Sequence, residues 1–119
     1  MSGPPGFSYV RLYADEHGLS RFEDVALDAG EGGAFAPLAV ESLVPCAVTA
    51  PPAPGPHNAP RRQLIVHLEG AVEVRASGGE TRRFGPGDVV LAEDVEGAGH
   101  VTSWVGEGPW RWLLLSLRG

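Results

Sequence analysis

Three histidines from residue 57 onward carry the most versatile chemistry of this chain: His57, His67 and His100. An imidazole can act as a general base near neutral pH, or it can bind zinc, iron, nickel or copper through a ring nitrogen. We expect the fourth histidine, His17, to be an exposed turn residue. The chemistry to look for is therefore proton transfer, with or without a divalent transition metal.

Two expected strands would bring these histidines to one cavity, because side chains alternate between the faces of a strand. The residues that would share the cavity face are Gln63, Ile65 and His67 on residues 63–68, and His100, Thr102 and Trp104 on residues 100–105. His67 is either a catalytic residue or a hydrogen-bonded core histidine. Trp104 either stacks on an aromatic substrate or fills the core.

Charged residues are expected at the mouth of the same cavity. Asp94, in an expected loop over residues 93–99, is either a general base or closes the loop through backbone amides. Arg61 and Arg62 precede the strand at 63–68, and one of them could pair with Glu93, Asp94 or an acidic ligand. We assign catalytic roles to His100, His67 and Asp94, and substrate contacts to Trp104, Arg61 and Ile65.

Short strands separated by glycine- and proline-rich turns account for most of the chain. We expect strands over residues 7–13, 20–27, 63–68, 71–76, 81–84, 89–92, 100–105 and 110–117, with one or two more within 34–50. Such a series is typical of a β-sandwich or β-barrel. We expect one all-β domain over residues 1–119, in which 1–50 pack on a barrel whose core motifs span 57–117. The proline-rich segment 51–60 is expected to be an ordered loop at the barrel mouth.

The composition excludes several classes of protein. The chain has 119 residues and a net charge of −6, with no basic run longer than two arginines, which argues against nucleic acid or an anionic membrane as partner. The single cysteine, Cys46, excludes an internal disulfide. The longest apolar run, residues 112–115, is too short to span a bilayer, and no signal peptide is visible. We expect a cytoplasmic protein.

The stretch 57–104 resembles the cupin superfamily. Cupins pair a first motif, His-x-His followed by Glu and Gly, with a second motif that begins Gly-Asp and ends in a histidine. Here a hairpin ending at Phe84 leads into Gly85-Pro86-Gly87-Asp88, and Gly99-His100 follows. The resemblance implies a jelly-roll β-barrel with a histidine-lined pocket.

The same resemblance implies a metal site with a degenerate first motif. His57, Gln63 and His100 match ligand positions, and Gln63 stands where a glutamate is usual. Ala59 replaces the second histidine, and Trp104 stands where an asparagine is common. Zinc, iron, nickel or manganese would then be held weakly, and a metal-free site is the alternative.

Small bacterial cupins are the subgroup that the chain resembles most. The expected function is an enzyme acting on a small organic molecule in secondary metabolism, of cyclase, isomerase or dehydratase type. A non-catalytic binding protein is the first alternative, and a metal-dependent dioxygenase is the second. The resemblance also implies a homodimer. Trp110 and Trp112 share one face of the last strand, and we expect them to serve core packing or a dimer interface.

Overall fold

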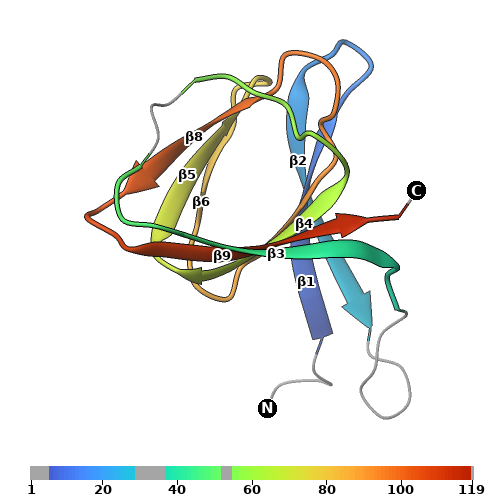
Figure 1. The fold of residues 1–119 in the computed structure, drawn as a ribbon. Coiled ribbons are helices and arrows are strands. Elements are labelled where there is room, and N and C mark those ends of the chain that lie inside the picture. The colour runs from blue at the N-terminus through green and yellow to red at the C-terminus, as the bar shows by residue number, and fades with distance from the viewer. Residues whose placement is uncertain (1–5, 29–36, 52–54, 119) are drawn as a thin grey trace, which may run out of the picture.

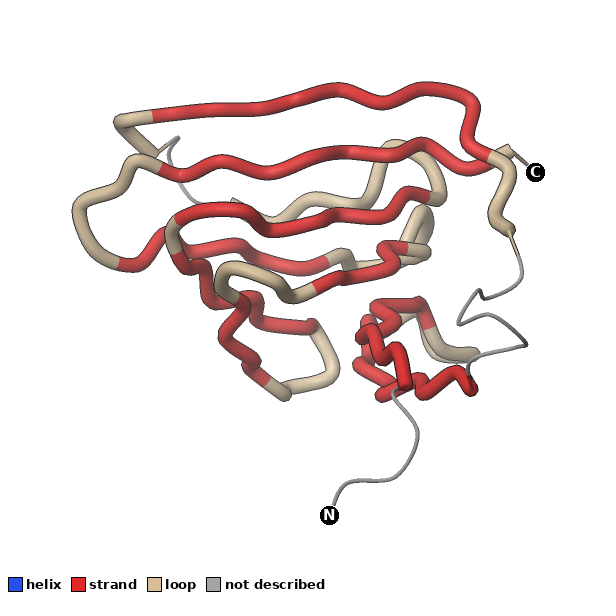
Figure 2. Tube along the Cα trace, turned by 90° about the horizontal axis from the view of Figure 1, so that it is seen from below, coloured by secondary structure: helices blue, strands red, loops and turns tan. Residues whose placement is uncertain are grey.

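Nine β-strands form the regular structure of the residues described here, which are 6–28, 37–51 and 55–118 of a computed structural model. The strands are β1 (Gly6–Ala14), β2 (Ser20–Asp28), β3 (Val40–Val48), β4 (Gln63–Glu69), β5 (Ala71–Ala76), β6 (Thr81–Phe84), β7 (Val89–Ala92), β8 (His100–Val105) and β9 (Trp110–Leu117). Figure 2 shows strands joined by loops, with no helix in these ranges. The all-β prediction is confirmed.

The strands form two sheets. The larger has six strands in the order β2-β1-β7-β4-β9-β3, and the smaller has three in the order β6-β5-β8. All neighbours are antiparallel except β1 and β7, which run parallel. Figure 1 shows the smaller sheet on one side of the molecule and β1 and β2 on the other.

The expected closed barrel is not found among the described residues. No ladder of strand pairs joins the two sheets, so each sheet keeps free edges, and the arrangement is compatible with a β-sandwich. Outside the named strands, the pairing recorded in these ranges is one isolated bridge between His57 and His100. That bridge ties the loop before β4 to the first residue of β8.

Apolar side chains from both sheets form one core cluster. Its buried members are Leu12, Phe22, Val72, Val74, Ala76, Phe84, Val90 and Trp110. The alternation of each strand places these residues on inner faces and sends their neighbours to solvent. Burial of these side chains removes apolar surface from water and holds the two sheets face to face.

Strand β3 lies at the edge of the larger sheet. The prediction of one or two strands within 34–50 is met by the single strand Val40–Val48, while residues 34–36 lie outside the described ranges. Pro45, which has no backbone N–H, is tolerated because β3 pairs on one side only, with β9. Leu43 and Val44 are exposed on this strand, so it presents apolar side chains to solvent.

The remaining strand predictions agree closely with the structure. Residues 71–76, 81–84, 89–92, 100–105 and 110–117 form strands with the predicted bounds. Of the proline-rich segment, residues 52–54 lie outside the described ranges, and 55–60 form a loop that contains the His57 bridge. In the described ranges, no helix is long and apolar enough to cross a membrane.

Candidate functional site

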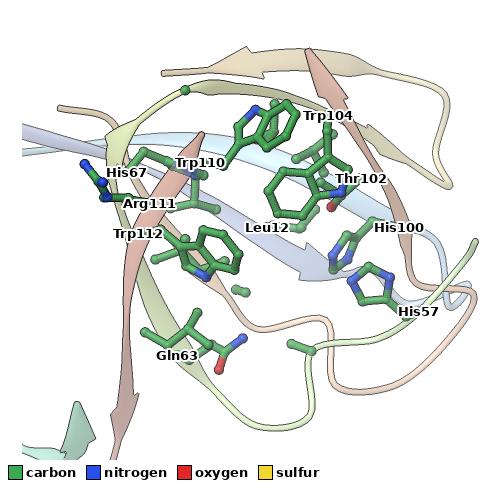
Figure 3. Close-up of a pocket in the computed structure, with 18 of the residues that line it drawn as sticks. Leu12, His57, Gln63, His67, His100, Thr102, Trp104, Trp110, Arg111 and Trp112 are labelled. Atoms are coloured by element: carbon green, nitrogen blue, oxygen red, sulfur yellow. The ribbon is translucent and has the colours of Figure 1, made fainter. Parts of the chain in front are cut away.

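A cavity of about 400 Å³ lies between the inner faces of the two sheets (Figure 3). This volume lies in the range of pockets that bind small molecules. Apolar side chains make up much of its wall. The polar and aromatic side chains that line it include His57, Gln63, His67, His100, Thr102, Trp104 and Trp112.

Asp94 and His100 form a buried pair at the wall of this cavity. The Nδ1 atom of His100 hydrogen-bonds with Oδ2 of Asp94, whose side chain is fully buried. When Asp94 is ionised, its carboxylate only accepts hydrogen bonds, and in that state this contact holds the ring proton on Nδ1 and makes Nε2 the basic nitrogen. The other oxygen, Oδ1 of Asp94, is buried and has no hydrogen-bond partner in the described part of the chain. The carboxylate therefore acts on His100 alone among these side chains.

His57 lies directly against His100. The two ring centroids are 4.5 Å apart, and the planes meet at 62°. Two backbone hydrogen bonds of 2.9 Å, one in each direction, join the same residues. The Nδ1 atom of His57 lies 3.3 Å from the carbonyl oxygen of Gly55, and the side chain is exposed. His57 thus stands at the solvent side of the pair formed by Asp94 and His100.

The loop between β7 and β8 is held against the segment that carries His57. The carbonyl oxygen of Asp94 accepts hydrogen bonds from the side-chain amide of Asn58 and from the backbone N–H of Ala59. Gly99 adopts a φ of +74°, and a Cβ there would lie 2.3 Å from the carbonyl oxygen of His57. Only glycine fits this close approach, so the packing of Gly99 sets where both histidines lie.

Strand β4 contributes the predicted residues Gln63, Ile65 and His67 to the cavity wall. Gln63 is 9% exposed, and its side-chain amide makes no hydrogen bond to the described residues. His67 lies farther along the strand, parallel to the ring of Phe84 at a centroid distance of 6.1 Å. Burial lowers the pKa of His67, and the nearby Asp88 carboxylate acts in the opposite direction. His67 is thus half-buried in the cavity wall, where burial favours its neutral form.

Three tryptophans form one aromatic cluster at the cavity. Trp104 lies 5.4 Å from Trp110 and 5.2 Å from Trp112, measured between ring centroids. Trp110 is buried in the core, and its indole N–H donates to the carbonyl oxygen of Ala71. Trp112 was expected to serve core packing or a dimer interface, yet it also lines the cavity. Its pairing with His67 across β4 and β9 explains this position, and strand alternation alone could not identify that partner.

Arg61 and Asp94 differ from the other predicted site residues because neither is among the residues that line the cavity. Arg61 is exposed. Its neighbour Arg62 pairs with Glu93, and Arg11 pairs with the same carboxylate. Burial raises the pKa of Glu93, but the hydrogen bonds and charges of the two arginines outweigh it and leave this pKa below its usual range. The two arginines therefore fix the position of Glu93, which begins the loop between β7 and β8.

Few of the described side chains near the cavity could donate to a resident metal ion. In the ranges 6–28, 37–51 and 55–118, no three side chains of His, Cys, Asp or Glu are grouped so that they could hold an ion. His57 and His100 supply two imidazoles and Gln63 a neutral amide, but Ala59 has no donor and Asp94 is engaged with His100. The described residues do not provide a conventional ligand set for such an ion.

Comparisons with known proteins do not assign a family. No protein-family model matches this chain, and no curated protein matches it.

Proposed function

We propose that this protein is an enzyme that transfers a proton to and from a small organic molecule, with His100 as the catalytic base. The observation that carries the proposal is the buried pair of Asp94 and His100 at the wall of a cavity. A histidine oriented by a carboxylate is a common proton-transfer device in enzymes. The reaction types that fit are isomerisation, cyclisation and dehydration.

We also propose that the fold is the jelly roll of a small cupin. Two features support this. The turn that contains Gly87 and Asp88 leads directly into β7, as the second cupin motif requires, and His100 begins β8. His100 then lies between two facing sheets, where cupins place their site.

The proposed step begins with a substrate that has a C–H bond next to a carbonyl group. The Nε2 atom of His100 takes the proton, and the electron pair of the broken C–H bond moves to the carbonyl oxygen, which forms an enolate. The amide of Gln63 can donate a hydrogen bond to that oxygen. Asp94 stabilises the imidazolium while it holds the proton.

The fate of the enolate sets the reaction type. If the substrate is a β,γ-unsaturated ketone, the enolate is conjugated with the C=C bond as a dienolate. Return of the proton from His100 to the γ-carbon of this dienolate gives the conjugated isomer. Loss of a β-hydroxyl group as water gives a dehydration, with the proton of His100 delivered to the leaving oxygen. Attack of the enolate carbon on a second carbonyl of the same molecule closes a ring, and the alkoxide oxygen formed at that carbonyl takes the proton from His100.

The test is exchange of the acidic C–H protons of 2-tetralone for deuterium in heavy water, followed by NMR. We expect the protein to accelerate exchange, and His100→Ala to lower the rate about 10²–10⁴-fold, which is the usual contribution of a general base. Asp94→Asn should lower the rate in the same direction because an amide does not stabilise the imidazolium. Arg61→Ala, an exposed position outside the cavity, is the control and should leave the rate unchanged.

Two results would overturn the proposal. One is an unchanged exchange rate in His100→Ala, which would remove His100 from the reaction. The other is 2-tetralone that binds in the cavity but exchanges no faster than in buffer. That result would favour a protein that binds small molecules without reacting with them.

We propose further that two copies of the chain associate through β3. The support is the apolar surface of this edge strand, where Leu43 is 52% exposed and Val44 is 49% exposed. Pro45 interrupts the backbone donors of the free edge, which disfavours simple strand addition. The contact would therefore be made by side chains of β3.

A further inference from the structure

The wall of the cavity has little charge to offer a ligand. Apart from histidines, the charged side chains among the described lining residues are Glu69 and Arg111, and these pair with each other at 2.5 Å. His100 is already engaged by Asp94. A carboxylate or phosphate placed in this cavity would lose hydration without finding a free arginine or lysine, which is costly. The ligand chemistry that fits is neutral.

Two indole rings remain available to a ligand. All three tryptophans line the cavity, but Trp110 is only 2% exposed and packs in the core, whereas Trp104 and Trp112 are half-buried. The planes of Trp104 and Trp112 are inclined by 51° to each other. In Figure 3 these two rings, together with Gln63 and His100, surround a common space. Aromatic rings prefer offset-stacked or edge-on partners, so this space favours a flat aromatic ligand over a saturated one.

The polar end of the cavity holds groups that lack a partner. Gln63 is nine-tenths buried and lines the cavity, yet its amide makes no hydrogen bond within the described residues. Thr102 is half-buried and also lines the cavity, and its hydroxyl group makes no hydrogen bond within the described residues. Both groups stay accessible from the cavity, since the buried side-chain atom without a partner in the described ranges is Oδ1 of Asp94. An oxygen on the ligand could accept a hydrogen bond from the amide of Gln63, which lines the same cavity as His100.

We infer that the cavity binds a neutral, flat aromatic molecule that carries a hydroxyl or carbonyl oxygen. The ring lies against Trp104 and Trp112, and the oxygen is directed at Gln63 and His100. The inference concerns the same cavity as the proposed function and names its substrate class. In this assignment Gln63 is a substrate-binding residue, in place of the metal ligand that the sequence resemblance implies.

The experiment compares three probes of similar outline by isothermal titration calorimetry. They are 2-naphthol, its saturated counterpart decahydro-2-naphthol, and naphthalene-2-sulfonate. We expect 2-naphthol to bind about tenfold more tightly than the saturated alcohol, because only the aromatic probe can interact with the indole rings. The sulfonate should show no measurable binding. Equal affinity for the aromatic and saturated alcohols, or binding of the sulfonate as tight as that of 2-naphthol, would overturn the inference.

Two variants test the orientation of the ligand in the cavity. Gln63→Leu removes the amide at similar volume. It should lower the affinity for 2-naphthol about five- to tenfold and leave the affinity for unsubstituted naphthalene unchanged. Trp112→Leu should lower the affinity for 2-naphthol and for naphthalene about tenfold each. Arg61→Ala is the matched control and should bind all probes as the wild type does. An unchanged affinity of 2-naphthol in Gln63→Leu would refute the assignment of its oxygen to Gln63.

The binding and exchange assays separate the two proposals. His100→Ala should lose deuterium exchange into 2-tetralone and still bind naphthalene. If 2-naphthol is selected as expected but the wild type shows no exchange, the ligand class stands and the enzymatic function fails. If exchange occurs but saturated ketones compete as well as aromatic ones, the function stands and the ligand class fails.

Discussion

Replacement of Gly99 by alanine tests how the two facing histidines are held together. Gly99 has a φ of +74°, which an L-residue with a side chain rarely adopts. Its added Cβ would lie 2.3 Å from the carbonyl oxygen of His57 and 2.7 Å from the carbonyl carbon. Both are backbone atoms that cannot rotate away. The segment that carries His57 must therefore move.

The expected loss of stability has two parts. A side chain in the left-handed region costs about 1–2 kcal/mol. Displacement of His57 also breaks its two backbone hydrogen bonds with His100, each 2.9 Å long, and such bonds contribute about 1 kcal/mol each. The free energy of unfolding should therefore fall by about 3–4 kcal/mol in Gly99→Ala. A typical domain is stable enough to remain folded after this loss.

Gly106→Ala provides the matched control. Gly106 has a similar φ of +80°, but a Cβ there would meet no atom within 4 Å. It should lose only the backbone part, about 1–2 kcal/mol. The measurement is urea-induced unfolding of both variants and the wild type. The difference between the two variants, about 2 kcal/mol, then reports the bridge between His57 and His100.

Hydrogen exchange of individual amides supplies a second readout. The amide protons of His57 and His100 should exchange faster with solvent in Gly99→Ala than in Gly106→Ala, because only the first variant separates the two segments. Equal losses of stability, with equal protection of both amides, would refute the reasoning. The bridge would then contribute nothing to the position of His57.

Two further predictions concern acid stability and assembly. Burial lowers the pKa of His67 below its ordinary value of 6.5. Below pH 6.5 the unfolded chain therefore binds a proton at this residue more readily than the folded chain does. The folded protein is thus fully stable with respect to His67 above pH 6.5 and loses stability as the pH falls below it. His67→Gln should therefore flatten the loss of unfolding free energy between about pH 7.5 and about pH 5.5, measured with urea; this group can contribute at most about 1.4 kcal/mol per pH unit, and an unchanged slope would contradict the assignment. Sedimentation equilibrium should show a dimer. Leu43→Glu should raise its dissociation constant at least about tenfold, which is about 1.4 kcal/mol. Val95→Glu, at an exposed apolar residue in the loop between β7 and β8, should leave the dimer intact. A monomeric wild type, or equal effects of both substitutions, would rule out association through β3.

Local patterns in the sequence determined most of the strands. Alternation and glycine- or proline-rich turns were enough to predict residues 71–76, 81–84 and 100–105 with the bounds found in the structure. These signals are local, since each depends on neighbouring side chains and on the conformations that turn residues allow. The same alternation placed Gln63 and His100 on faces that line the cavity.

Only the tertiary structure decided which residues meet. The sequence left Asp94 as either a base or a loop-closing residue, and the structure places its carboxylate on His100 and its carbonyl oxygen on Ala59. It also assigned Arg62 to Glu93 and left the adjacent Arg61 exposed. These contacts depend on how loops cross between strands far apart in the chain, and on close approaches that only glycine permits. No periodic pattern encodes that geometry, so the order of strands in the two sheets and the partner of His100 come from the fold.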